Sequence, residues 1–124
     1  LLETALANHV KDRTAWQTML KGNGEAASLE EKRQLLMDLC ADDISALQDR
    51  FGLQAITLLE GESTVDIAYP VMEFPTKVKA HNFDKTPRVE GRLMGIKGQY
   101  LMFDTGVLNI RKFGGYHVHL ETMQ

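Results

Sequence analysis

The sequence of 124 residues has few of the features that usually identify a function. Its single cysteine, Cys40, excludes an internal disulfide and fits a reducing cytoplasm. Its apolar runs are too short to cross a bilayer, and no repeat has solenoid spacing. It also lacks a glycine loop that precedes a helix and cradles phosphate, and it lacks a serine nucleophile elbow. The sequence therefore predicts no self-contained active site, and we expect Cys40 to be a small buried or half-buried hydrophobe.

Charge is unevenly distributed along a chain whose formal net charge is −3. Residues 1–75 hold six Lys and Arg against 13 Asp and Glu, whereas residues 76–124 hold eight against four. A basic C-terminal part is typical of contact with nucleic acid. Attraction between an acidic and a basic half would explain the same division, so both interpretations stay open.

The first part of the chain predicts helices. Leu2, Leu6 and Val10 recur every four residues, which is typical of one helix face. We expect a second helical piece over 15–20, capped by Asp12 or Thr14.

A longer helix is expected to begin after Ser28, because Ser28 and Glu31 have capping-box spacing, and to end near Arg50 before Gly52. Its periodicity predicts that these residues are buried: Leu29, Leu36, Leu39, Ile44, Leu47 and Phe51.

The rest of the chain predicts antiparallel strands, because short Val-, Ile-, Leu-, Phe- and Tyr-rich runs are separated by glycine turns. The strands expected near the C-terminus are Val89–Ile96, Gln99–Asp104, Val107–Phe113 and Tyr116–Glu121. Further candidates are Ala55–Leu59, Val65–Val71 and Lys77–Lys79. The fold class is therefore α+β, with two or three N-terminal helices followed by a strongly bent antiparallel sheet or small barrel of five to seven strands. We expect a helical segment over 1–54 and a β module over 55–124.

Basic and aromatic side chains of the β module form the candidate site. Alternate residues of a strand share a face, so aligned strands would bring cations and a tyrosine onto one surface. Such a surface suits phosphate contact together with stacking on unpaired bases. The candidate nucleic-acid-binding residues are Arg88, Arg92, Lys97, Tyr100, Arg111, Lys112 and Tyr116. Lys and Arg that simply solvate a sheet are the alternative.

Two histidines, His117 and His119, would lie on one strand face about 6.6 Å apart, a spacing that some metal sites use. A third ligand would have to come from His81, Asp104 or another carboxylate. Surface histidines on a terminal strand are the simpler interpretation.

Three stretches carry a resemblance to a known family: Asp12-Arg13-Thr14-Ala15-Trp16, Tyr69-Pro70 with Phe74-Pro75-Thr76-Lys77-Val78, and the run from Lys97 to Tyr116. Over essentially its whole length the chain resembles the bacterial domain-of-unknown-function family 2797. The resemblance, together with a start at Leu1 inside an expected helix, implies the C-terminal part of a longer protein. Upstream, that family has paired cysteines resembling a zinc-binding module and a segment similar to the GIY-YIG nuclease fold.

The same resemblance implies that Glu3 occupies the position of a metal-binding glutamate of GIY-YIG-like nucleases. The tyrosine and arginine partners of that chemistry would lie upstream, so Glu3 alone would not catalyse, and a solvated glutamate is the alternative. Zinc or a divalent cation is accordingly expected in the full-length protein and no cofactor in this part of it.

We therefore expect a non-catalytic cytoplasmic module that binds nucleic acid for an upstream nuclease-like domain. The alternative is an interaction module that packs on the N-terminal half of the same protein or self-associates.

Overall fold

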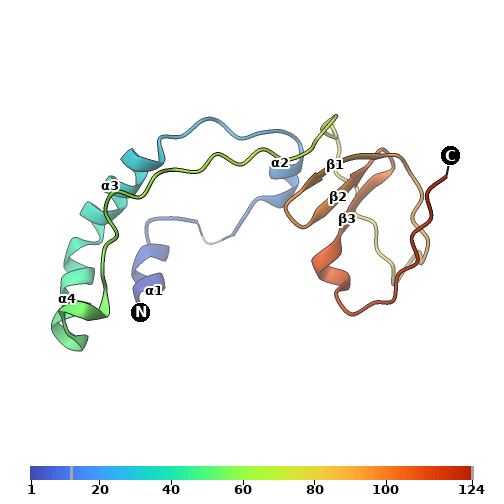
Figure 1. Ribbon diagram of the computed structural model, residues 1–124. Coiled ribbons are helices and arrows are strands. Elements are labelled where there is room, and N and C mark those ends of the chain that lie inside the picture. Colours follow the sequence, from blue (N-terminus) through green and yellow to red (C-terminus); the bar gives the residue numbers. More distant parts are fainter. Residues whose placement is uncertain (12, 124) are drawn as a thin grey trace. The chain divides into compact units, whose positions relative to one another are not determined.

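The structure, a computed structural model, describes residues 1–11 and 13–123. The chain forms two compact units. We call them the helical unit, Leu1–Ala15 with Gly24–Ile67, and the sheet unit, Trp16–Asn23 with Ala68–Gln124. Helices and an antiparallel sheet are both present, which confirms the α+β class (Figure 1). Asp12, one of the two expected caps, lies outside the described residues.

The helical unit contains α1 (Leu2–Ala7), α3 (Leu29–Leu39), α4 (Ala41–Phe51) and the 3-10 helix η1 (Leu53–Ala55). As expected, the Ser28 hydroxyl caps α3 by accepting a hydrogen bond from the Glu31 N–H at 3.3 Å. The single long helix expected up to Arg50 is instead two, since Cys40 has φ −100° and ψ 7° and separates α3 from α4. Gly52 then ends α4 with a φ of 97°.

The helical unit buries little apolar surface. Cys40 and Ile44 are buried as expected, but Leu29, Leu39 and Phe51 are 57%, 52% and 54% exposed. The periodicity correctly marks apolar faces on α3 and α4. No second layer of structure in the described part of the helical unit covers these faces, so the expectation that Leu29, Leu39 and Phe51 are buried was wrong. In the part of the chain that the structure describes, no helix is both long and apolar enough to span a bilayer.

The sheet unit is built on strands β1 (Leu93–Lys97), β2 (Tyr100–Phe103) and β3 (Gly106–Asn109), in the order β1-β2-β3. Both pairings are antiparallel, and Tyr100 lies opposite Lys97 on one side and Asn109 on the other (Figure 1). The sheet has three strands and is not closed, which corrects the expected five to seven.

The missing strands have identifiable causes. Val65 and Ile67, which alternate as in a strand, are 74% and 72% exposed and pair with no strand of the described chain. The expected Val107–Phe113 strand stops at Asn109, because the Asn109 side chain accepts a hydrogen bond from the Lys112 N–H at 3.2 Å and starts the 3-10 helix η2 (Ile110–Phe113). Residues 116–121 likewise remain outside the sheet.

One stretch, residues 68–81, protects both edges of the sheet. On the β1 side the Ile96 N–H donates to the Pro70 carbonyl at 2.9 Å, and Val71 bridges Gly95. On the β3 side the Val107 N–H donates to the Lys79 carbonyl at 2.8 Å. A Cβ on Gly95 would lie 2.9 Å from Val71 Cα, so glycine is required for this close approach. Short bridges therefore satisfy edges that would otherwise be open.

Helix α2 (Trp16–Leu20) supplies the layer that covers the sheet, next to which it lies in Figure 1. Leu20, Tyr100, Met102 and Val107 form the buried cluster. Trp16 stacks on Tyr100 with ring centroids 5.6 Å apart and planes at 4°. A sheet this small needs such a cover, because it cannot bury an apolar face by itself.

Lys97 fixes α2 to the sheet. Its side chain is 6% exposed, and its ammonium donates to the Met19 carbonyl at 2.8 Å and to the Gly22 carbonyl at 2.9 Å. These carbonyls lie at and just beyond the C-terminal end of α2, where helix carbonyls have no partner within the helix. The rings of Tyr69 and Phe74 lie 5.9 and 5.4 Å from the same nitrogen. The buried ammonium of Lys97, on β1, thus supplies hydrogen-bond donors to the carbonyl groups at the C-terminal end of α2.

We predict that Lys97→Met lowers the free energy of unfolding of the sheet unit by about 2–3 kcal/mol, since two carbonyls lose charge-assisted hydrogen bonds. Urea unfolding followed by the fluorescence of Trp16, the only tryptophan, measures the change. Lys21→Met, at an exposed lysine of the same unit, is the control and should stay within about 0.5 kcal/mol of the unaltered chain. Equal midpoints for the two variants would contradict this role.

Candidate nucleic-acid interface

Three aromatic rings gather where η2 meets the turn at residues 82–85. Phe83 and Phe113 have centroids 5.0 Å apart and Phe113 and Tyr116 5.3 Å apart, both pairs edge-on. Phe113 is 5% exposed, whereas Tyr116 is 49% exposed. Phe113 therefore anchors the group, and Tyr116 presents its ring to solvent.

A hydrogen bond fixes the exposed tyrosine. The Tyr116 hydroxyl donates to the Asp84 carboxylate at 2.5 Å, and the Asp84 N–H donates to the Asn82 side chain at 2.9 Å. The Asn82 side chain thereby forms a local turn that positions Asp84. The hydrogen bond to Asp84, then its negative charge and then partial desolvation raise the pKa of Tyr116 above the usual 10.0. Because the ring is held at both ends, little rotamer freedom remains to be lost when a ligand stacks on it.

Cations lie beside these rings. Arg111 and Lys112 are exposed in the last turn of η2, and the Lys112 ammonium lies 5.5 Å from the Phe113 ring centroid. Lys85 is exposed and directly follows Asp84. We call this group the aromatic–basic cluster; its members are Phe83, Lys85, Arg111, Lys112, Phe113 and Tyr116. Three of the candidate residues, Arg111, Lys112 and Tyr116, belong to it.

Two other candidates lie on the segment before β1. Arg88 pairs with Glu90, and both side chains are largely exposed. The Arg92 N–H donates to the Asp104 carboxylate at 2.9 Å, and its guanidinium is exposed. Arg88 already has a carboxylate partner, which a phosphate would have to displace.

The structure places Lys97 and Tyr100 in the interior of the sheet unit. The Lys97 ammonium is bonded to backbone carbonyls, and the 8% exposed Tyr100 ring lies against Trp16. In this arrangement neither presents a surface to a phosphate or a base.

Glu3 and the paired histidines lie outside the aromatic–basic cluster. Glu3 is exposed in the first turn of α1, a helix with no buried residue. His117 and His119 are exposed, and His119 Nε2 lies 3.2 Å from a Glu121 carboxylate oxygen. Over residues 1–11 and 13–123 no group of three His, Cys, Asp or Glu side chains is arranged to hold a metal ion.

His81 belongs to a separate network at the turn between β2 and β3. The Thr105 hydroxyl donates to the Glu90 carbonyl at 2.7 Å and lies 3.1 Å from His81 Nε2. Since the hydroxyl has one proton, Nε2 must be the donor of the second bond, which assigns the tautomer. Burial and then the positive charge of Lys79 lower the pKa of His81 below 6.5, which favours the neutral ring, and in the neutral ring a donating Nε2 carries the proton.

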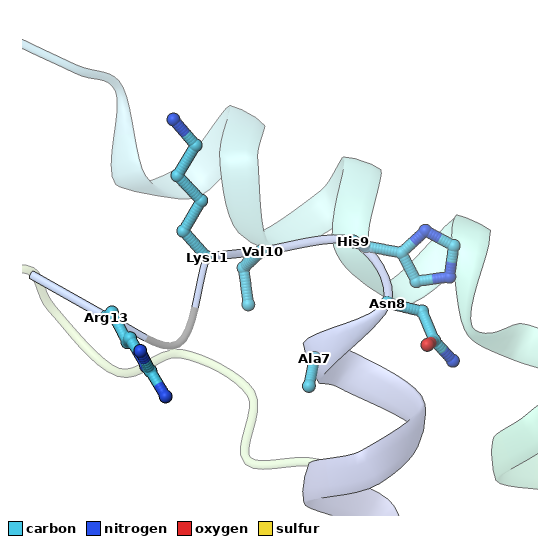
Figure 2. Close-up of a pocket in the computed structure, with 6 residues that line it drawn as sticks. All are labelled: Ala7, Asn8, His9, Val10, Lys11 and Arg13. Atoms are coloured by element: carbon cyan, nitrogen blue, oxygen red, sulfur yellow. The ribbon is translucent and has the colours of Figure 1, made fainter.

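A hollow of about 470 Å³ in the helical unit follows the end of α1. Figure 2 shows its lining, in which the side chains of Asn8, His9, Lys11 and Arg13 point in different directions rather than toward a common centre. This hollow therefore assembles no group of cooperating side chains.

Sequence reasoning missed the supporting residues of the aromatic–basic cluster. Asp84 and Phe83 lie about thirty residues before Tyr116, and no periodicity connects them. The spacing of Asn82 and Asp84 does contain a signal, because an Asn side chain commonly accepts from the N–H two residues later. That signal predicts a turn but not its partner.

Comparison with known proteins gives one match. Residues 1–118 match the family described as protein of unknown function, DUF2797. No curated protein and no solved structure matches the chain.

We predict a stability contribution from Tyr116 that disappears at high pH. Its raised pKa means that the neutral phenol is favoured in the folded state, so the contribution is complete below about pH 10 and is lost as pH rises through the higher folded value. Tyr116→Phe should therefore unfold at lower urea than the unaltered chain at about pH 8, with a smaller difference at about pH 11. Titration of tyrosinate absorbance should also lose a component above about pH 10 in Tyr116→Phe but retain it in Tyr69→Phe. A constant difference between the two pH values would contradict the Asp84 contact.

Proposed function

The chain belongs to the DUF2797 family, and from its residues we propose that the sheet unit binds single-stranded nucleic acid as a non-catalytic module. The observation that carries the proposal is the aromatic–basic cluster, in which the exposed Tyr116 ring lies beside η2 with its two cations. Stacking of aromatic rings on unpaired bases tolerates any sequence, and neighbouring Lys and Arg contact the phosphates. The composition supports this, since the sheet unit holds nine Lys and Arg against five Asp and Glu.

The proposal favours single strands over duplexes. A base inside a duplex offers only its edge, so a protruding tyrosine beside two cations is better suited to an unstacked base. Three exposed cations of the cluster, Lys85, Arg111 and Lys112, would neutralise about three phosphates. Within the longer protein that the family resemblance implies, such a module would hold the strand for a nuclease-like segment. Glu3 belongs to no group of three metal-ligating side chains among the described residues, and the proposal assigns it no metal-dependent step.

We predict that fluorescence polarisation with labelled oligonucleotides detects binding to single strands whose log affinity falls against log salt with a slope of about −2. Arg111→Ala and Lys112→Ala should each reduce that slope by about 0.7, because each removes one phosphate contact. Tyr116→Ala should weaken binding by about 1–3 kcal/mol, whereas Tyr116→Phe, which keeps the ring and loses only the hydrogen bond to Asp84, should weaken it much less.

Arg50→Ala provides a matched control. Arg50 is also exposed and lies 4.9 Å from the ring of its neighbour Phe51, but it belongs to the acidic helical unit. Its removal should leave the affinity unchanged. Absence of binding at low salt, or an equal loss in Arg50→Ala and Arg111→Ala, would refute the proposal.

A second candidate function, an interaction module, is favoured by the helical unit. Leu35 and Leu39, one turn apart on α3, are 53% and 52% exposed, and Leu29 on the same helix is 57% exposed. This unit holds five Lys and Arg against 12 Asp and Glu, the opposite sign to the sheet unit. Exposed leucines on an acidic helix suit a partner that is apolar with basic margins.

For this second function we predict concentration-dependent association, either of the chain with itself or with the upstream half of the protein, measured by light scattering. Leu35→Glu should weaken the association by at least about tenfold, because it places a charge in an apolar contact. Ser45→Glu, which adds the same single negative charge at an exposed residue of α4 in the same unit, provides a charge-matched control. Identical masses at all concentrations, with and without the upstream half, would exclude this function.

A further inference from the structure

A second hollow, of about 370 Å³, lies within the sheet unit between residues 73–77 and the sheet. Met94 of β1 and Met102 and Phe103 of β2 line it from the sheet, and Phe74 and Pro75 line it from the opposite segment. Its volume is near the lower end of the roughly 300–1,000 Å³ that small-molecule sites occupy. These apolar side chains form one part of the lining, and the methionine side chains among them adjust to ligands of different outline.

Thr76 and three charged side chains complete this lining; the charged ones are Glu73, Lys77 and Asp104. The Asp104 carboxylate is oriented by the Arg92 N–H, which donates to one of its oxygens at 2.9 Å. Neither Glu73 nor Asp104 forms an ion pair within the described part of the chain. The two carboxylates exceed the single ammonium by one negative charge, although the unit as a whole is positive. The hollow thus differs in sign from the surface around it.

We propose that this hollow binds a ligand that carries an ammonium or guanidinium group on an apolar stem or ring. Lysine and arginine side chains and small aromatic amines belong to this chemical class. The cation would lie at Glu73 and Asp104, since charge-assisted hydrogen bonds to carboxylates are stronger than neutral ones. The apolar part would contact Met94 and Phe103, where sulfur and aromatic groups interact favourably with methylene groups and rings.

The proposal is independent of nucleic-acid binding. The hollow and the aromatic–basic cluster share no residue, and a polyanion would be repelled by the two carboxylates that attract a cation. Lys77 is the one lining group that could instead hold a phosphate or a carboxylate. An anionic probe therefore distinguishes the two possibilities.

The test uses the full chain with methyl-labelled methionine, observed by NMR during titration with phenethylammonium. The resonance of Met94 should shift and saturate, whereas Met37 in the helical unit should not move. Phenethyl alcohol, which has the same ring without the charge, should bind at least about fivefold more weakly. Phenylpropionate should bind more weakly still.

Glu73→Gln and Asp104→Asn should each weaken phenethylammonium binding by about fivefold, because each removes one charge and keeps a side-chain oxygen. Glu121→Gln removes an exposed carboxylate outside the hollow and should have no effect. If Asp104→Asn disturbs the spectrum of the free chain, Glu73→Gln alone decides, since no hydrogen bond of the Glu73 side chain to a described residue would be lost. Unsaturable shifts, equal binding of the alcohol or the anion, or unchanged affinity in Glu73→Gln would each overturn the proposal.

Discussion

The sheet unit depends on one buried cation. Lys97 at the end of β1 reaches the carbonyls of Met19 and Gly22, which precede it by more than seventy residues in the chain. Removing an ammonium from water is costly, and backbone carbonyls compensate only when they are fixed in place. Helix α2 fixes them, and Tyr69 and Phe74 close the site with ring faces. The same contact therefore closes the C-terminal end of a five-residue helix and holds the cover of a three-stranded sheet.

This arrangement decides where a functional surface can lie. Lys97 and Tyr100 lie opposite each other in the β1–β2 pair, and both are buried in the core. The Lys97 ammonium and the Tyr100 ring are therefore not available on the surface. Beyond β3, Asn109 turns the chain into η2 instead of a longer strand, and the next cations are thereby placed on a turn beside Phe113 and Tyr116. A strand there would have alternated Arg111 and Lys112 between two faces. The turn presents both to solvent.

How much of the fold could be predicted depends on how far apart in the sequence the interacting residues lie. Ser28 and Glu31 lie within one helical turn, and Gly98 lies in the turn between adjacent strands, so local rules predicted the start of α3 and the β1–β2 hairpin correctly. The alternation of Val65 and Ile67 predicts a strand equally well, but a strand exists only where a partner edge is available. Residues 68–81 already occupy the edges of this sheet. The burial of Lys97 was likewise invisible, because its partners are distant in sequence and a lysine before glycine resembles an ordinary turn.

The sheet unit can attract a polyanion through its net positive charge and a small cation through the carboxylates of its hollow, because the two attractions act over different distances. The excess of cations on the sheet unit would attract a polyanion at distances up to a Debye length, which is about 10 Å at ordinary ionic strength. Within a lined hollow the nearest groups dominate, and there Glu73 and Asp104 outnumber Lys77. A small cation would approach against a weak, screened field and then meet the Glu73 and Asp104 carboxylates at contact. A long anion would remain on the outer cations, where screening by added salt weakens its binding first. The two kinds of ligand would therefore use different groups of the same unit, and a polyanion, which makes more ionic contacts, would lose more affinity as salt rises.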